Sequence, residues 1–393
     1  MKHAPALPRD FLFSAVNCGL KKEGPDLALI TSKYPAYAAA VFTTNRVQAA
    51  PILLCKRHIG NRIAGVVINS KNANAVTGPE GDRNALRTAS LLAKKLKVKP
   101  GNILVASTGV IGRQLPMRKI EAGIDAAFPL LAPSENNAPK AIMTTDKFEK
   151  KAYRQVTIDG TEIRIFAMAK GAGMIHPNMA TMLVFITTDA AIVPTVQRRI
   201  LLDAVNATFN RISVDGDTST NDMVLMLANG RAGNKPVRSG AAERLLARAV
   251  RELCEEIGVL IVKDGEGATK VIKITVKGAR DRASATAIAR TVATSNLTKT
   301  AFYGADANWG RILAAAGRAG VAFNAYRATL TLNGITIYRR GRILTDETEE
   351  LDLLMKKPMQ DVVLDCGLGK GKDSYWFSDL THEYVTVNAD YRT

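Results

Sequence analysis

The residues with the clearest potential for covalent chemistry stand near the middle of the chain, at the junction of Ala180 and Thr181. A threonine hydroxyl is a weak nucleophile at neutral pH unless a base lies beside it. Cleavage of the peptide bond before Thr181 would supply that base, because the new α-amino group has a pKa of roughly 7.7 to 8 and can accept the hydroxyl proton of its own residue. The sequence suits such a cut, since Ala180 leaves the carbonyl unshielded and Gly171 and Gly173 permit strained backbone upstream. The other interpretation is a loop that enters a buried strand.

The sequence around this junction resembles the self-cleavage signature of the ornithine acetyltransferase family, the glutamate N-acetyltransferases of the cyclic arginine pathway. The resemblance extends over nearly the whole chain, with distinctive motifs in one order. The motifs are DLALITS from Asp26, AAVFTTNRVQAAP (39–51), VINSKNANAVTG (67–78), STGVIG (107–112), IMTTDKF (142–148), KGAGMIHPNMATML (170–183), SVDGDTSTND (213–222), KDGEGATK (263–270), NWGRILAAAGRAG (308–320) and YVTVNADYRT (384–393).

The resemblance implies a fold, an activity and an assembly. The fold is an α/β layered sandwich of mixed or antiparallel sheets flanked by helices. Self-cleavage between Ala180 and Thr181 gives an α chain (1–180) and a β chain (181–393) that share one site in an α2β2 assembly. In a ping-pong reaction Thr181 takes the acetyl group of N2-acetylornithine and passes it to glutamate. No local motif decides whether acetyl-CoA also serves as donor, and no cofactor is implied.

A second chemical element follows the apolar run NILVAS (102–107), which is typical of a buried strand. Acyl transfer passes through an oxyanion that preorganised donors must stabilise. A Thr hydroxyl and a Gly amide at the exit of a rigid strand can both point at one spot. By the resemblance, Thr108 and Gly109 form the oxyanion hole. The alternative is a plain turn that connects a strand to a helix.

Further polar residues match positions that bind substrate in the family. A Lys near the cut can pair with a substrate carboxylate, and a Glu between two glycines can face its ammonium group. The residues implied are Thr144, Lys170, Thr181, Glu266, Asn388 and Thr393. The motif IMTTDKF leaves the choice between Thr144 and Thr145 open, with a slight preference for Thr144. The last two positions require the C-terminus to fold back into the site.

The hydrophobic pattern predicts the elements that carry these residues. Strands are expected at 27–31, 38–44, 51–55, 65–70, 102–107, 182–187, 223–230, 259–263, 271–279 and 383–393, and a hairpin at 156–170 around the type I′ dipeptide Asp159-Gly160. Helices are expected at 83–96, 198–208, 241–257, 283–295 and 311–320. The helix at 241–257 has an apolar stripe that includes Leu245, and arginines on its other side.

Two motifs imitate ligand sites but fail their templates. Asp215, Asp217 and Ser219 are spaced like the first ligands of an EF-hand, yet Thr220 and Met226 replace the required Gly and Glu. These side chains are therefore expected to bond their own backbone and line the wall of the site. The tail motif CGLGKGKDS resembles a phosphate loop, but Lys372 replaces a required Gly, so residues 367–371 are interpreted as a hairpin connection.

Composition narrows the classes of protein that the chain can belong to. Its 393 residues are 47% apolar and 23% charged, as in ordinary globular proteins, and length alone suggests two or three domains. The four cysteines and four histidines are scattered, so neither a disulfide framework nor a metal site is predicted. No apolar run approaches a membrane span and the N-terminus lacks a signal peptide, so a cytoplasmic protein without membrane contacts is expected.

The formal charge of +18 leaves one class of partner to consider. Dispersed Lys and Arg residues with few aromatic ones argue against nucleic-acid binding and favour attraction of anionic substrates. Two alternatives to the acetyltransferase remain. One is an N-terminal-nucleophile aminopeptidase or amidohydrolase of similar architecture, in which water accepts the acyl group. The other is a basic interaction protein that never cleaves.

Overall fold

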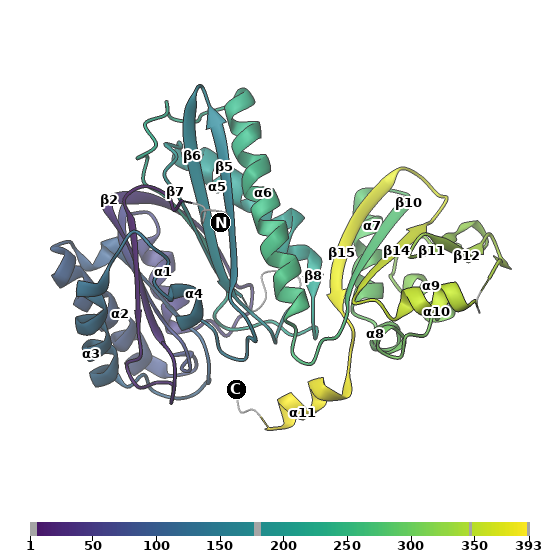
Figure 1. Cartoon of the computed structure of the whole chain (residues 1–393), viewed down its shortest axis with the longest axis horizontal. Coiled ribbons are helices and arrows are strands. Elements are labelled where there is room, and N and C mark those ends of the chain that lie inside the picture. The colour runs from purple at the N-terminus through teal and green to yellow at the C-terminus, as the bar shows by residue number, and fades with distance from the viewer. Residues whose placement is uncertain (1–5, 177–181, 346–347, 391–393) are drawn as a thin grey trace.

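The computed structural model describes residues 6–176, 182–345 and 348–390 and contains two β-sheets with helices packed on them (Figure 1). The strands of the first sheet are β1 (Phe11–Val16), β2 (Leu27–Phe42), β3 (Ile63–Asn69), β4 (Ile103–Ser107), β5 (Lys150–Ile158), β6 (Thr161–Lys170), β7 (Leu183–Thr188) and β9 (Met223–Ala228). Those of the second are β8 (Ile212–Ser213), β10 (Val271–Ala279), β11 (Thr329–Leu332), β12 (Ile335–Arg339), β13 (Arg342–Ile343), β14 (Met359–Asp365) and β15 (Gly371–Ser378).

The helices lie outside the two sheets. They are α1 (Ala50–His58), α2 (Gly78–Leu96), α3 (Met117–Ala127), α4 (Ala138–Ala141), α5 (Pro194–Ala207), α6 (Gly240–Lys263), α7 (Arg282–Ala293), α8 (Asn296–Tyr303), α9 (Trp309–Gly317), α10 (Glu349–Met355) and α11 (His382–Asp390). None of these helices is long and apolar enough to cross a lipid bilayer.

The first sheet is mixed, with the strand order β4-β3-β2-β9-β7-β6-β5 and β1 paired to β2. Strand pairs β3–β4 and β7–β9 are parallel, and the other neighbouring pairs in this sheet are antiparallel. The central strand β2 pairs with β3 through its first half and with β9 through its second, with a shift of register between Thr31 and Ala36. The segment 33–35, expected to separate two strands, is therefore an irregularity inside one long strand.

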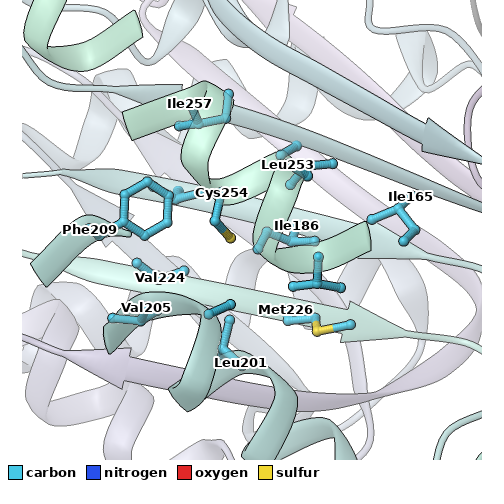
Figure 2. Close-up of a cluster of buried hydrophobic side chains, with 14 of the residues drawn as sticks. Ile165, Ile186, Leu201, Val205, Phe209, Val224, Met226, Leu253, Cys254 and Ile257 are labelled. Carbon is cyan, nitrogen blue, oxygen red and sulfur yellow. The ribbon is translucent and has the colours of Figure 1, made fainter. Parts of the chain in front are cut away.

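Both faces of the central strands are buried, which explains their uninterrupted apolar sequences. In β7, Val184 and Ile186 pack beneath helices α5 and α6, while Leu183 and Phe185 point into a second cluster on the opposite face. Figure 2 shows the first of these clusters, in which Ile186 lies among side chains from α5 and α6. Helices α2 and α3 cover the sheet at β2, β3 and β4. A rigid, doubly covered strand therefore follows directly after the proposed cleavage junction.

The second sheet has the order β13-β12-β11-β14-β10-β15-β8 and packs one face on α7 and α9. Its strand β10 lies between β14 and β15, parallel to the first and antiparallel to the second. The predicted hairpin connection at residues 367–371 is therefore wrong, because the two strands that it joins are separated by β10. Two hairpin partners would have required direct hydrogen bonds between β14 and β15.

Three segments expected to be strands are helical. Residues 51–55 belong to α1, where Pro51 occupies the first turn and its fixed φ favours helix initiation. Residues 259–263 complete α6, in which Leu253, Ile257 and Ile261 continue a buried stripe at a spacing of four. Short apolar runs do not distinguish a strand from a buried helix by periodicity, which is why both predictions failed. Within α6, Leu245 is exposed and does not belong to the buried stripe.

The third such segment is the C-terminal tail, where α11 replaces the expected strand at 383–393. Alternating side chains favoured a strand, but no sheet edge receives this segment, and Val385 is 65% exposed. Helical spacing instead places Tyr384 and Asn388, four residues apart, on one face. Figure 1 shows α11 below the junction of the two sheets. Tyr384 and Asn388 line a polar cavity there.

The other predicted elements are confirmed, with boundaries that differ by a few residues. They are the strands at 65–70, 102–107, 182–187, 223–230 and 271–279, and the helices at 83–96, 198–208, 283–295 and 311–320. The hairpin is formed by β5 and β6, and Asp159 and Gly160 both have positive φ, as a type I′ turn requires.

Candidate active site

A polar cavity of about 230 Å³ lies where the ends of several strands meet α11. It brings together six of the residues singled out from the sequence, namely Thr108, Gly109, Thr144, Lys170, Glu266 and Asn388. The remaining ones, Ala180, Thr181 and Thr393, lie outside the described residues, so the proposed division of the chain after residue 180 stays a prediction. The acidic block also lines this cavity with Asp215, Asp217, Ser219, Thr220 and Asn221, as its sequence predicted.

The loop that follows β4 requires a glycine at position 109. Gly109 has φ +130°, and a Cβ at this position would lie 2.3 Å from the backbone carbon of Lys71 and 2.6 Å from the nitrogen of Asn72. The flanking residues are fixed to the same neighbouring segment, since Thr108 N–H donates to Asn69 O at 3.0 Å and Val110 N–H donates to Lys71 O at 3.2 Å. This close approach holds the Thr108-Gly109 backbone rigidly at the cavity wall.

A buried polar network supports this loop from behind. The Ser107 hydroxyl donates to Asn69 Oδ1 at 2.6 Å, and Asn221 Nδ2 donates to Ser107 O at 2.8 Å and to Ala73 O at 2.7 Å. Asn221 is 5% exposed and comes from the segment before β9, far along the chain. Its side chain therefore joins the two sides of the cavity, a role that sequence reasoning did not assign to it.

Lys170 stands at the end of β6 in a charged environment. Burial lowers the pKa of its ammonium group, and the carboxylate of Asp146 opposes this effect. Burial alone would raise the pKa of Asp146, but the positive charges of Lys170 and Lys150 prevail and lower it to about 2. Asp146 is therefore ionised at neutral pH and stabilises the positive charge of Lys170.

Lys150 connects three of the segments that form the cavity. It is fully buried and forms ion pairs with Asp146, at 2.6 Å, and with Asp264. Asp146 also accepts hydrogen bonds from the backbone N–H groups of Thr144, which lines the cavity, and of Gly171, which follows Lys170. One ammonium group thus ties together the segments that carry the threonines, the lysine and the glutamate of the site. Sequence reasoning missed this cluster, because Asp264 lies far along the chain from Asp146 and Lys150.

Glu266 is oriented by two side chains and a backbone contact. Its Oε1 accepts a hydrogen bond from the Thr145 hydroxyl at 2.7 Å, and its Oε2 accepts one from Asn388 Nδ2 at 2.9 Å. Its own N–H donates to Ala172 O at 2.9 Å. The C-terminal helix therefore reaches into the cavity and holds the carboxylate of Glu266 in one position.

Asp215, which the sequence predicted to line the site wall, also binds the backbone of a distant segment, and Tyr384 is a cavity residue that the sequence did not reveal. Asp215 Oδ2 and Oδ1 accept the backbone N–H groups of Met174 and Ile175 at 2.6 and 2.8 Å. Burial raises the pKa of Asp215 to about 6, although these hydrogen bonds act in the opposite direction. Burial also raises the pKa of the Tyr384 phenol, and the neighbouring carboxylates of Asp215 and Glu266 add to this effect.

The fold and the cavity together define an α/β protein whose strand ends enclose a polar cavity lined by a lysine, threonines and carboxylates. Within the described residues, no group of His, Cys, Asp and Glu side chains has the arrangement of a metal site. The chain belongs to the ArgJ family, whose sequence profile matches residues 12–393. The family predicted from the sequence motifs is thereby confirmed.

Individual relatives agree with this assignment over their full length. The chain is 48% identical over 396 residues to the arginine biosynthesis bifunctional protein ArgJ of Nitratidesulfovibrio vulgaris, covering 99% of this chain and 100% of the relative. It is 44% identical over 395 residues to the protein of the same name from Thermotoga neapolitana, covering 98% and 100%. The crystal structure of ArgJ from Bacillus halodurans matches with a TM-score of 0.51 and 38% identity, covering 53% of this chain and 98% of the solved chain. The predicted fold class is confirmed.

Proposed function

We propose that this chain is the acetyltransferase of arginine biosynthesis that transfers the acetyl group of N2-acetylornithine to glutamate. Family membership over the full length supports this activity. The observation that carries the proposal is the convergence of Thr108, Gly109, Lys170 and Glu266 from distant segments on one cavity. These residues supply a lysine for a carboxylate, a carboxylate for an amine, and a Thr-Gly pair suited to an oxyanion.

The nucleophile is generated by self-cleavage before Thr181. The hydroxyl oxygen of Thr181 attacks the carbonyl carbon of Ala180, the peptide C–N bond breaks, and the hydroxyl proton passes to the departing amine. Water then hydrolyses the resulting ester. The products are an α chain that ends at Ala180 with a carboxylate and a β chain that begins with Thr181, whose α-amine and hydroxyl are both free.

Acetyl transfer then proceeds in two half-reactions. The α-amine of Thr181 accepts the hydroxyl proton while the oxygen attacks the acetyl carbonyl of N2-acetylornithine, and Thr108 and Gly109 stabilise the oxyanion. The C–N bond breaks, the amine of Thr181 returns the proton to the leaving nitrogen, and ornithine departs. The α-amine of glutamate attacks the acetyl-threonine ester in the same manner, which yields N-acetylglutamate and regenerates Thr181.

The polar side chains of the cavity hold the amino acid during both steps. Lys170 pairs with a substrate carboxylate and Glu266 faces an ammonium group, each held in place by the contacts described above. Thr144 is the threonine that contacts substrate, because the hydroxyl of Thr145 already donates to Glu266. Asn388 and Thr393 complete the site from the C-terminus.

A second donor and an assembly belong to the same proposal. The relatives from N. vulgaris and T. neapolitana are named bifunctional, which supports acetyl-CoA as an additional acetyl donor. The α and β chains remain associated, because β6 and β7 on either side of the cut are hydrogen-bonded neighbours in one sheet. We propose an α2β2 assembly, which the mass of the native complex tests directly.

The activity is tested by incubating the purified protein with N2-acetylornithine, with and without glutamate. An acetyltransferase releases ornithine and forms N-acetylglutamate in equal amounts. Without glutamate it releases ornithine only slowly. Rapid release of ornithine and acetate without glutamate would instead identify the amidohydrolase of the alternative interpretation. Thr181→Ala should abolish both cleavage and turnover, and retained turnover would refute Thr181 as the nucleophile.

A further inference from the structure

The backbone that leads into the cleavage segment is fastened to the walls of the cavity. We call residues 171–175 the approach segment. At its start, Gly171 N–H donates to Asp146 Oδ1 at 2.8 Å, and Ala172 O accepts from Glu266 N–H at 2.9 Å. The first half of the approach segment is therefore held by the carboxylate that stabilises Lys170 and by the backbone of Glu266.

Asp215 fastens the other end of the approach segment. One of its oxygens accepts Met174 N–H at 2.6 Å and the other accepts Ile175 N–H at 2.8 Å. Ile175 O in turn accepts the N–H of Val214 at 2.8 Å. Two successive amides and one carbonyl are thereby bound to a single neighbouring strand end, which fixes both the position and the direction of the chain.

These hydrogen bonds hold the backbone in a conformation that it would not readily adopt alone. Met174 has φ +54°, in the left-handed region that residues with a side chain seldom occupy. Such a conformation costs free energy and persists only where the surroundings enforce it. The two hydrogen bonds to Asp215 on Met174 and Ile175 are the contacts in a position to enforce it.

The hydrogen bonds to Asp215 lie close to the proposed cleavage junction in the sequence. Downstream of the cut, Met182 O accepts Met223 N–H at 3.1 Å and β7 begins at Leu183. Upstream, Ile175 is the last residue bound by Asp215. Only residues 176–181 lie between these two anchors, and a shorter span between fixed ends has fewer conformations to search before the reactive one is reached.

We propose that Asp215 is a positioning residue for self-cleavage, which fixes the upstream anchor so that the carbonyl of Ala180 is presented to the hydroxyl of Thr181. The inference rests on the proposed function, because it presupposes cleavage before Thr181. Asp215 binds backbone amides and takes no part in the covalent steps. Its effect is on how often the precursor reaches the reactive geometry.

The surroundings of Asp215 suit a rigid anchor. Lys299, which is 3% exposed, donates from Nζ to Val214 O and to Ser378 O, so the strand end that carries Asp215 is itself immobilised. An aspartate is required at this position because both oxygens accept an N–H. In Asp215→Asn one of them becomes an NH2 group, which cannot accept and instead faces a backbone donor.

The proposal is tested by the rate at which precursor converts to two chains, followed by intact mass under denaturing conditions. Asp215→Asn should slow conversion by about tenfold or more, because two hydrogen bonds to a charged group are lost or weakened. The matched control is Asp189→Asn. Asp189 is also fully buried and accepts a backbone amide, that of Arg164 at 2.8 Å, but at the opposite end of β6 and β7. This control should cleave at nearly the normal rate.

A second measurement separates positioning from general loss of stability. In the uncleavable Thr181→Ala background, amide hydrogen exchange at Met174 and Ile175 should accelerate about tenfold when Asp215→Asn is added, with exchange elsewhere in β6 and β7 unchanged. Slow cleavage with unchanged protection of these two amides would overturn the proposal.

The outcomes distinguish this inference from the proposed function. A wild-type protein that remains one chain would refute self-cleavage itself. A wild-type protein that cleaves normally, together with Asp215→Asn cleaving equally fast, would refute only the role of Asp215. Equal slowing by Asp215→Asn and Asp189→Asn would show that loss of any buried carboxylate suffices, which also overturns the proposal.

Discussion

Gly173 lies directly against the carboxylate of Glu266, so closely that a Cβ on this glycine would come within 2.5 Å of Oε2 and 2.7 Å of Oε1. The carboxylate also accepts hydrogen bonds from the side chains of Thr145 and Asn388. The approach segment therefore packs directly against Glu266, the proposed ammonium-binding residue. Cleavage segment and substrate site are built from the same backbone.

This contact predicts the effect of a single methyl group. Gly173→Ala should displace the Glu266 carboxylate, because distances this short force one of the two groups to move. We expect kcat/KM for glutamate to fall by about tenfold to a hundredfold, since small misplacements of binding groups carry such costs. Steady-state kinetics of the cleaved enzyme measure the effect. Gly317→Ala is the control, because a Cβ there meets nothing within 4 Å, and it should leave kcat/KM unchanged. Equal activity of the two variants would contradict the prediction.

Gly109 permits a second prediction about the oxyanion site. Gly109→Ala combines an unfavourable φ with a collision against the backbone of Lys71 and Asn72, so the loop that carries Thr108 must shift. If this loop supplies the oxyanion donors, kcat should fall by about 10² to 10³ while the protein remains folded.

The control for Gly109 isolates the collision from the backbone strain. Gly160, in the β5–β6 turn, also has a positive φ, of +77°, but the Cβ added in Gly160→Ala meets no atom within 4 Å. This variant should lower stability by about 1 kcal/mol and leave kcat unchanged. A normal kcat for Gly109→Ala would show that this loop does not form the oxyanion hole.

The sequence predicted best those elements whose burial left a simple pattern. Residues 65–70 and 182–187 are continuous apolar runs because both faces of β3 and β7 are covered. Asp159 and Gly160 identified the β5–β6 hairpin through turn chemistry alone. The failures, at 51–55 and 259–263, are short runs whose conformation is decided by packing partners that the sequence does not display.

The same distinction holds for the site. Motif resemblance identified residues that converge on one cavity, since such residues stand within recognisable local blocks. The cluster of Lys150, Asp146 and Asp264 could not be predicted, because its members are joined only by the tertiary fold. The contacts of Asp215 with Met174 and Ile175 likewise depend on how β8 is placed beside the approach segment.

The buried cluster leads to a prediction about stability. Lys150→Met keeps the aliphatic bulk of the side chain but leaves Asp146 and Asp264 without their common cation. Removal of one partner from a buried ion pair costs about 3 to 5 kcal/mol, so the free energy of urea unfolding should fall by that amount. Lys151→Met is the matched control on the adjacent residue. Its ion pairs with Glu135 and Glu149 are solvent-accessible and contribute about 1 kcal/mol at most. Similar losses in both variants would show that the buried ion pairs of Lys150 contribute no more to the free energy of unfolding than the exposed ones of Lys151.

The raised pKa of Asp215 predicts a specific pH dependence. The folded pKa of about 6 lies above the ordinary value of 3.8, so the folded state favours the protonated form. The stabilising contribution of Asp215 is fully present below pH 3.8 and is lost as the pH rises through 6. The shift of about 2 pKa units corresponds to roughly 3 kcal/mol.

This dependence is measured as a difference between two uncleavable proteins. In the Thr181→Ala background, the free energy of unfolding of the Asp215 protein minus that of Asp215→Asn should decrease by roughly 3 kcal/mol between pH 4 and pH 7. The ionised form that accepts both amides at neutral pH is thus the less stable one, a cost that the positioning role explains. A difference that stays constant or increases with pH would contradict the assignment.

Asn388 allows the contribution of the C-terminus to be tested within one helix. Asn388→Ala removes the hydrogen bond to Glu266 Oε2, and loss of a hydrogen bond to a charged group should reduce kcat/KM for glutamate by about tenfold. Removal of residues 388–393 should reduce activity further, because it also deletes Thr393. Val385→Ala lies on the same helix with its side chain 65% exposed, and should leave kinetics unchanged. Because Asn388 lines the cavity, full activity after the truncation would mean that the site is complete without the last six residues.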